Sequence, residues 1–253
     1  MPRTLQTPRA AVHVHPDAAT LCRAAAEDFV HRALEAVAAR GVFNVALSGG
    51  STPKGMFAIL ASDTELRAAA PWADIRFFFG DERTVPPDHA DSNYRMANDA
   101  LLSKVPVQAK NVFRMRGEDK NPKHAAEDYE FILRSQLPTL DGTPVFDLFY
   151  LGMGPDGHTA SLFPGTKALH DSDHDVVANW VGKFYCWRLS LTVKVINRAK
   201  QVIFLAAGDD KAAPLKAVLE GPVETEQLPS QLIRPANLLW LVDEAAAKML
   251  EPR

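Results

Sequence analysis

A glycine-rich segment brings an aspartate and a histidine together where they could move protons. Residues 152–158, G-M-G-P-D-G-H, follow the apolar run Phe146–Leu151, which predicts a buried parallel strand. The glycines allow a tight turn and a close approach of the backbone to a ligand. Open α/β sheets bind ligands at the carboxyl ends of their strands, so Asp156 and His158 are candidates for proton transfer near neutral pH. The alternative is an ordinary glycine-rich turn whose histidine only caps a helix.

A second loop has the composition of a phosphate site. The segment Ser48–Pro53, S-G-G-S-T-P, lies between the apolar run Val42–Leu47 and a helix expected to begin near Lys54. A helix N-terminus offers unpaired N–H groups and a partial positive charge, both of which suit an anion. The alternative is a capped βα turn, in which Ser, Thr and Gly are common. The loop matches neither of the glycine-rich nucleotide motifs. The candidate phosphate-binding residues are Ser48, Gly49, Gly50, Ser51 and Thr52.

Cationic side chains near the expected strand ends could pair with the same anion. Lys211 follows Gly208, Asp209 and Asp210 at a strand-to-helix junction, from which its ammonium group could reach a phosphate. Any one of these cations could instead be an ordinary solvated surface charge. The candidates are Arg83, Arg95, Arg188 and Lys211.

The order of elements predicts how these residues are positioned. Strands are expected at Val12–His15, Val42–Leu47, Ile75–Phe79, Phe146–Leu151, Arg188–Thr192, Gln201–Ala206 and Leu238–Val242. Helices are expected at Ala18–Arg40, Lys54–Ala61, Ser92–Leu102, Ala125–Gln136 and Lys211–Leu219, with a last one ending near Leu250. This alternation predicts an α/β fold with a doubly wound, mainly parallel sheet flanked by helices. Four polar clusters would then converge on one face of the sheet: Ser48–Thr52, Asp81–Arg83, Asp156–His158 and Gly208–Lys211.

Size and composition limit the classes of function. The 253 residues fit one domain spanning 1–253, and a net charge of 28 − 31 = −3 gives no basic field for nucleic acid. No apolar stretch approaches the roughly 20 residues that cross a bilayer, and the N-terminus lacks a secretory signal. The two distant cysteines, Cys22 and Cys186, indicate no disulfide framework. We therefore expect a cytoplasmic protein that binds neither nucleic acid nor membrane, and that is a monomer or a weak dimer.

Longer motifs resemble those of a known family. The chain carries V-A-L-S-G-G-S-T-P, then F-F-F-G-D-E-R-T-V-P-P followed by S-N-Y-R, then L-G-M-G-P-D-G-H-T-A-S-L-F-P-G. It continues with R-L-S-L-T, V-I-N-R-A, L-P-S-Q-L-I-R-P and L-W-L-V-D-E-A-A-A. In this order, from about Val42 to Leu250, the motifs resemble the 6-phosphogluconolactonase family of the glucosamine/galactosamine-6-phosphate isomerase superfamily. Two segments depart from it: Lys183–Trp187 is unusually aromatic, and Ala236-Asn237 stands where a glycine is frequent.

The resemblance implies a fold and a reaction. The fold is Rossmann-like, of the phosphosugar isomerase/lactonase type. The reaction is the hydrolysis of 6-phospho-D-glucono-1,5-lactone to 6-phosphogluconate in the oxidative pentose phosphate pathway, by a carboxylic ester hydrolase. The partner is thus a small phosphosugar lactone, and neither a metal nor an organic cofactor is expected.

For such a reaction His158 is the expected general base, which activates water for attack on the lactone carbonyl. Asp156 would orient the imidazole or stabilise its cation. Asp81, the third candidate catalytic residue, would hold sugar hydroxyls or assist proton transfer, while Asn93 and Arg95 would line the sugar pocket.

The developing oxyanion requires donors as well. They could come from backbone N–H groups of the Gly152–Gly157 loop or from Arg83, and Gly154 of that loop is a candidate substrate-binding residue.

Other readings of the sequence remain. An aminosugar-phosphate isomerase or deaminase on the same fold would keep the phosphate loop, but the deaminase pattern has an Asn-Glu pair where Thr159–Phe163 stands and a tyrosine where Arg83 stands. A phosphosugar sensor usually carries a DNA-binding appendage or lacks the histidine. A serine nucleophile is disfavoured because no G-x-S-x-G motif occurs. The run H-D-S-D-H at 170–174 resembles a metal site only superficially.

Overall fold

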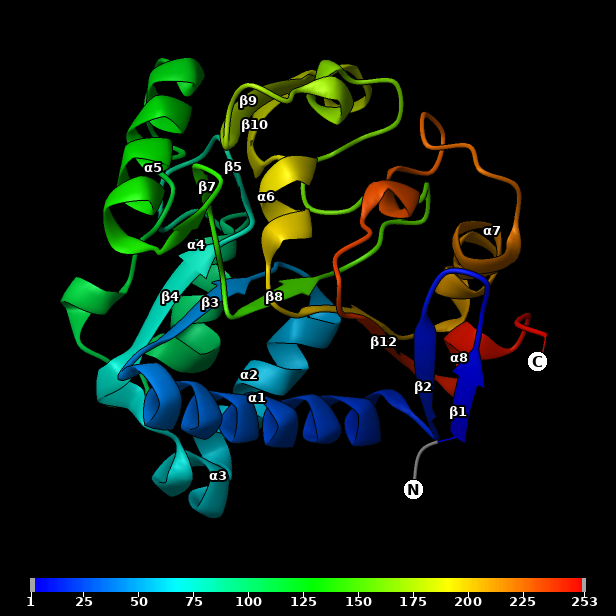
Figure 1. Cartoon of the computed structure of the whole chain (residues 1–253), viewed down its shortest axis with the longest axis horizontal. Coiled ribbons are helices and arrows are strands. Elements are labelled where there is room, and N and C mark those ends of the chain that lie inside the picture. Colours follow the sequence, from blue (N-terminus) through cyan, green and yellow to red (C-terminus); the bar gives the residue numbers. More distant parts are fainter. Residues whose placement is uncertain (1–2, 252–253) are drawn as a thin grey trace.

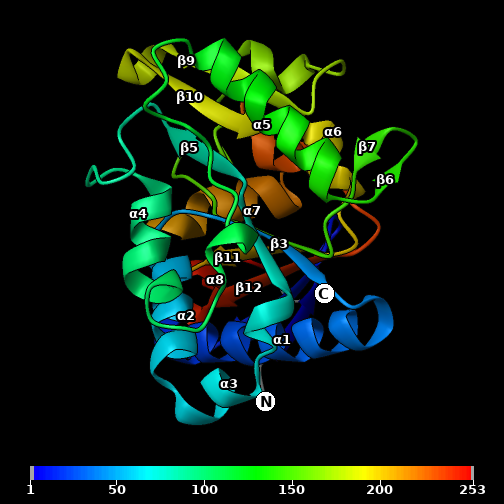
Figure 2. The same ribbon diagram turned by 90° about the vertical axis from the view of Figure 1, so that its left-hand side faces the viewer.

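The computed structural model describes residues 3–251 and has a central seven-stranded sheet covered by helices on both faces (Figures 1 and 2). Its strand order is β1-β2-β12-β11-β8-β3-β4. All neighbours in it pair in parallel except β1 and β2. The strands are β1 (Arg3–Gln6), β2 (Ala11–His15), β3 (Phe43–Leu47), β4 (Ile75–Phe79), β8 (Leu148–Leu151), β11 (Val202–Ala206) and β12 (Leu238–Asp243). After β3 the chain adds β4 on one side and β8 on the other, so the topological switch point lies between β3 and β8, where doubly wound sheets bind ligands.

Strand alternation sends side chains into two separate cores. Phe77 and Phe79 of β4 pack into the cluster that contains Phe29 of α1 and Phe57 of α2, whereas Phe78 packs into the other. The larger helices are α1 (Ala18–Arg40), α2 (Ser51–Ser62), α5 (Pro122–Gln136) and α7 (Ala212–Glu220). The shorter ones are α3 (Thr64–Ala69), α4 (Asn93–Ala97), α6 (Val193–Arg198) and α8 (Glu244–Ala247). Within the described residues, no helix combines the length and the apolar character that a bilayer crossing demands.

A second sheet, which the sequence did not predict, lies against the first. It has three antiparallel strands in the order β5-β10-β9: β5 (Asp81–Arg83), β9 (Val176–Val181) and β10 (Cys186–Leu191). Figure 2 shows β5 continuing from β4 toward β10. Gly80 connects the sheets, because its N–H donates to Leu47 of β3 and its carbonyl accepts from Leu191 of β10. A small hairpin, β6 (Thr139–Leu140) and β7 (Thr143–Pro144), completes the strands.

Most expected elements are present, with corrections to the details. The strand expected at Arg188–Thr192 begins earlier, at Cys186, and belongs to the antiparallel sheet, so Arg188 lies within a strand rather than near its end. Asp81–Arg83, expected as the loop that closes β4, is itself a strand. Helix α2 begins at Ser51, not near Lys54, because the N–H of Lys54 already donates to the carbonyl of Gly50.

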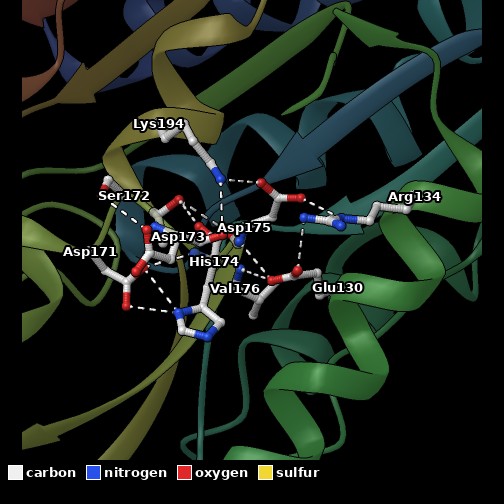
Figure 3. Close-up of polar contacts among 10 residues, drawn as sticks. Glu130, Arg134, Asp171, Ser172, Asp173, His174, Asp175, Val176 and Lys194 are labelled. Atoms are coloured by element: carbon white, nitrogen blue, oxygen red, sulfur yellow. Dashed lines mark hydrogen bonds and ion pairs between the residues drawn. The ribbon is translucent and has the colours of Figure 1, made fainter. Parts of the chain in front are cut away.

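The histidine- and aspartate-rich segment 170–174 is part of a structural network (Figure 3). His174 Nδ1 contacts the carboxylate of Asp171 at 3.0 Å. The next residue, the fully buried Asp175, accepts from Arg134 of α5 at 2.8 Å and pairs with Lys194 of α6 at 2.9 Å. These contacts fasten the loop before β9 to two helices.

Candidate active site

The predicted polar clusters meet at the carboxyl edge of the main sheet, at the switch point, around a cavity of about 180 Å³. Ser48–Pro53, the candidate phosphate loop, follows β3, and Gly152–His158, the histidine loop, follows β8. Lys211 lies after β11. The second sheet supplies the remaining wall through β5. The cavity is lined by Ser48, Gly49, Gly50, Ser51, Thr52, Pro53, Asp81, Arg83, Asn93, Gly152, Met153, Gly154, His158, Ala160, Leu205 and Lys211. The sequence prediction that four clusters converge is therefore correct.

His158 and Asp156 form a hydrogen-bonded pair. Nδ1 of His158 lies 2.5 Å from Oδ1 of Asp156, and both side chains are about three-quarters buried, with 23% and 25% of their area exposed. Partial burial would raise the pKa of Asp156, but hydrogen bonds from His158 and Lys183 outweigh it and lower that pKa to about 2. Asp156 is thus a carboxylate at neutral pH. It holds the Nδ1 edge of the ring, which leaves Nε2 as the nitrogen free for a substrate.

Two glycines shape the loop that carries this pair. A Cβ on Gly154 would lie 2.0 Å from His158 Nδ1, so only glycine lets the imidazole sit where it does. Gly157 has φ +73°, and its carbonyl accepts both the N–H and the hydroxyl of Ser230. The N–H groups of Gly154 and Gly157 donate to His158 and Gly154 carbonyls, respectively. Those two amides are consequently occupied and are not free oxyanion donors, although Gly154 lines the cavity as expected of a substrate-binding residue.

Buried polar contacts fix Asp81 and Asn93. The Asp81 carboxylate accepts from Ser161 Oγ at 2.7 Å and from Asn93 Nδ2 at 3.1 Å. The neighbouring Glu82 accepts four hydrogen bonds: the backbone N–H groups of Arg83, Asn93 and Tyr94, and the hydroxyl of Ser92. Burial raises the pKa of Glu82, and these donors oppose the rise. Glu82 therefore caps the start of α4 and holds Asn93 at the cavity wall.

The candidate phosphate loop has the geometry expected of an anion site, except that its helix begins earlier than predicted. Since α2 begins at Ser51, the first-turn amides of that helix themselves face the cavity region that Ser48–Gly50 lines. Gly50 adopts φ +110°, which few other residues could do. A Cβ on Gly49 would meet Asn93 Oδ1 at 2.1 Å, so the loop packs tightly on the β5–α4 side. Lys211, half-buried, closes the other side and pairs with Asp210 at 2.8 Å.

The three candidate arginines differ in position. Arg83 lines the cavity and donates to the carbonyl of Asp91. Arg188 is the cross-strand partner of Arg83, but it is not among the lining residues, and its guanidinium lies 5.7 Å from the Phe184 ring. The Nε atoms of both are buried, and residues 3–251 offer them no hydrogen-bond partner. Arg95 points away and donates to the carbonyl of Asp88, because residues two apart on a helix, such as Asn93 and Arg95, face opposite sides.

Sequence reasoning missed several residues that contact the candidate catalytic side chains. Lys183, at the tip of the β9–β10 hairpin, donates to Asp156 Oδ2 at 2.9 Å. Phe163 stacks on His158 with ring centroids 4.0 Å apart, and Ser161 bonds Asp81 as described above. The T-A-S-L-F run after the histidine carried a signal for the last two, since it continues the motif. Nothing local signalled Lys183, because its contact depends on a hairpin that folds over from 27 residues away.

Comparison with known proteins agrees with this geometry. The model of the family described as glucosamine-6-phosphate isomerases/6-phosphogluconolactonase matches residues 16–241. The chain belongs to this family. A 6-phosphogluconolactonase of Synechocystis is 42% identical over 224 residues, which cover 87% of this chain and 90% of that protein. The family's Rossmann-like α/β fold is accordingly the fold seen here.

Solved structures of family members superimpose over nearly the whole chain. The crystal structure of the devB protein gives a TM-score of 0.86 at 35% identity, covering 95% of this chain and 99% of that one. The 6-phosphogluconolactonase of Trypanosoma brucei gives 0.83 at 30% identity, covering 97% of this chain and all of that one (100%). Within this family, the chain resembles proteins named as lactonases in sequence and in structure.

Proposed function

We propose that this chain is a 6-phosphogluconolactonase, which hydrolyses 6-phospho-D-glucono-1,5-lactone to 6-phosphogluconate. The single observation that carries the proposal is that His158, held by Asp156, lines the same small cavity as Ser48–Thr52 at the N-terminus of α2. The relatives support it as well, because proteins named 6-phosphogluconolactonase share much of this sequence and match it over most of its length. The site draws on residues from position 48 to position 211, so we treat 1–253 as one functional domain.

The hydrogen bond to Asp156 determines what His158 can do. A carboxylate at Nδ1 favours the tautomer with hydrogen on Nδ1, which leaves the Nε2 lone pair as the base. In our proposal Nε2 takes a proton from the water that attacks C1 of the lactone. The resulting imidazolium, stabilised by Asp156, then gives that proton to the ring oxygen as the ester bond breaks. A positioned general base and acid of this kind contributes about 10²–10⁴ in rate.

Charged groups on the β5 side complete the reaction centre. Arg83 is the proposed electrostatic partner of the oxyanion, because it lines the cavity. The N–H groups of Gly154 and Gly157 already donate to backbone carbonyls and are not free for this role. The Asp81 carboxylate uses part of its accepting capacity on Ser161 and Asn93, and its remaining lone pairs can accept from sugar hydroxyls. Asn93 is a positioning residue for Asp81.

We assign the 6-phosphate to the other end of the cavity. The first turn of α2 and the hydroxyls of Ser48, Ser51 and Thr52 supply donors there. Lys211 supplies the cation once its contact with Asp210 is exchanged for one with the phosphate. This placement leaves the lactone ring between the phosphate loop and His158.

A substrate comparison tests the proposal. Acid release from freshly generated 6-phosphogluconolactone is measured with the spontaneous opening subtracted, alongside unphosphorylated glucono-1,5-lactone and alongside ammonia release from glucosamine 6-phosphate. We expect fast hydrolysis of the phosphorylated lactone, much slower hydrolysis of the unphosphorylated one, and no ammonia. Lactone hydrolysis at the background rate together with ammonia release would replace this proposal with an aminosugar-phosphate deaminase.

A further inference from the structure

The tip of the β9–β10 hairpin lies against the catalytic pair. It comprises Gly182–Phe184, one 3₁₀ turn, followed by Tyr185 with φ +50° before β10 resumes. The tip overlaps the aromatic segment Lys183–Trp187. The tip is mostly exposed, and none of its residues lines the cavity. It can therefore influence the reaction only through the residues it contacts.

Two contacts lead from this tip to His158. Lys183 Nζ donates to Oδ2 of Asp156 at 2.9 Å, while Oδ1 of the same carboxylate holds the imidazole at 2.5 Å. The ring of Phe184 packs edge-on against Phe163 at 5.6 Å, and Phe163 stacks on the imidazole at 4.0 Å. The Lys183–Asp156 contact thus acts on Nδ1 of the imidazole, and the Phe184–Phe163 contact acts on the face of its ring.

These contacts restrict motions that Asp156 alone would permit. A carboxylate held only by a histidine can rotate about its terminal bond, which is soft in aspartate. A second charge-assisted hydrogen bond to the opposite oxygen opposes that rotation and keeps Oδ1 directed at Nδ1. The aromatic contacts oppose tilting of the imidazole. The pair is therefore held from a strand hairpin as well as from its own loop.

We propose that Lys183 is a positioning residue of the catalytic pair. Lys183, Asp156 and His158 form a hydrogen-bonded series, called here the relay, through which the hairpin tip sets the orientation and proton affinity of the base. The proposal rests on the lactonase function proposed above. Lys183 does not touch the substrate; it acts through Asp156.

The electrostatic consequence has a definite sign. A cation one carboxylate away from the imidazole disfavours its protonation, so removing the Lys183 charge makes His158 easier to protonate. The other charged groups that line the cavity with His158 are Asp81 and Arg83 of β5 and Lys211, which pairs with Asp210, and the substitution leaves all of them in place. Since the base works only when unprotonated, the acid limb of the pH–rate profile moves to higher pH. For a half-exposed lysine in physiological salt we expect a move of about half a pH unit.

The test compares three variants with the wild type. Lys183→Met removes the charge at similar length, and Lys183→Arg restores it. Lys167→Met is the matched control, because Lys167 is an exposed lysine of the turn Lys167–His170 that lines the same surface hollow as Lys183. The acid limb of kcat/KM is expected to shift upward by about half a unit in Lys183→Met, with kcat reduced about threefold and KM changed less than about twofold. Lys183→Arg and Lys167→Met should follow the wild type.

A substrate-free measurement separates this proposal from the lactonase assignment. The Hε1 signal of His158, identified by its loss in His158→Gln, is titrated by NMR in the wild type and in Lys183→Met. An upward shift of its titration midpoint supports the relay even if no lactone is hydrolysed, an outcome that would count only against the proposed function. Coincident midpoints and coincident acid limbs would overturn the relay, as would an equal shift in Lys167→Met.

Discussion

Replacing Gly154 by alanine is the sharpest steric test of the catalytic pair. An ideal Cβ at this position would lie 2.0 Å from Nδ1 and 2.1 Å from Cε1 of His158, and 2.9 Å from Oδ1 of Asp156. The closest Cβ contacts that occur in proteins are about 3 Å, so the ring must move by roughly 1 Å. Gly154 is not among the glycines with positive φ, and the effect should therefore come from this overlap and not from backbone strain.

The expected loss follows from that displacement. A shift of 1 Å breaks the 2.5 Å contact between His158 and Asp156 and removes the base from its position. Misplacement of a catalytic group by about 1 Å costs about 100-fold in rate, or about 2.7 kcal/mol of transition-state stabilisation. Overpacking of this kind also costs about 1–3 kcal/mol of folding free energy, so the variant should be assayed well below its melting temperature.

The assay measures kcat/KM for the phosphorylated lactone and the circular dichroism of each variant. Gly182→Ala is the matched control: a Cβ there meets nothing within 4 Å, so it displaces neither Lys183 nor Phe184, the two tip residues that contact the catalytic pair or Phe163. We expect Gly154→Ala to lose about two orders of magnitude while remaining folded, and the control to keep nearly full activity. A folded Gly154→Ala within threefold of the wild type would refute the reasoning, since it would mean that the position of the imidazole does not matter.

Three further substitutions test separate parts of the site. The pKa of Asp156 is lowered to about 2, so its charge stabilises the fold above about pH 4, and this stabilisation is lost as pH falls toward 2. The difference in melting temperature between wild type and Asp156→Asn should therefore shrink as pH falls from 4 to 2. A difference that stays constant would contradict the assignment. Glu82→Gln places an amide among four donors and should cost about 2–3 kcal/mol in urea unfolding, whereas a loss below 0.5 kcal/mol would show that the capping contacts are dispensable. Lys211→Ala should raise KM for the phosphorylated lactone at least tenfold and leave kcat for the unphosphorylated lactone unchanged. If the substitution impairs hydrolysis of both lactones equally, Lys211 does not bind the phosphate.

The sequence identified six of the seven strands of the main sheet, all but β1, because those six carry their own signals. Ile75–Phe79 is a continuous apolar run and has the predicted bounds, and α1 ends at Arg40 as predicted, with Gly41 beyond it in the left-handed conformation. The second sheet escaped detection for the opposite reason. Asp81–Arg83 is polar and reads as a loop, yet it pairs with β10, and such pairing over more than 100 residues leaves no local pattern.

The same distinction applies to the site. The sequence predicted that His158, Asp156, Asp81 and the loop Ser48–Thr52 lie together, because each follows a recognisable strand or belongs to a motif. Arg95, expected in the sugar pocket, lies away from the cavity because it is two residues from Asn93 on one helix, a spacing that directs the two side chains to opposite sides. Lys183 was out of reach, since its role depends on where a hairpin tip lies in space.

The most direct test of the proposed mechanism is the single-turnover hydrolysis of 6-phosphogluconolactone by wild type and by His158→Gln, with spontaneous opening subtracted and folding verified. Glutamine keeps much of the volume of the imidazole but cannot accept the proton from water. If His158 is the base, the rate falls by about 10²–10⁴ while binding of the phosphorylated lactone changes little. A folded His158→Gln that turns over at a rate near that of the wild type would show that the proton is taken by another group.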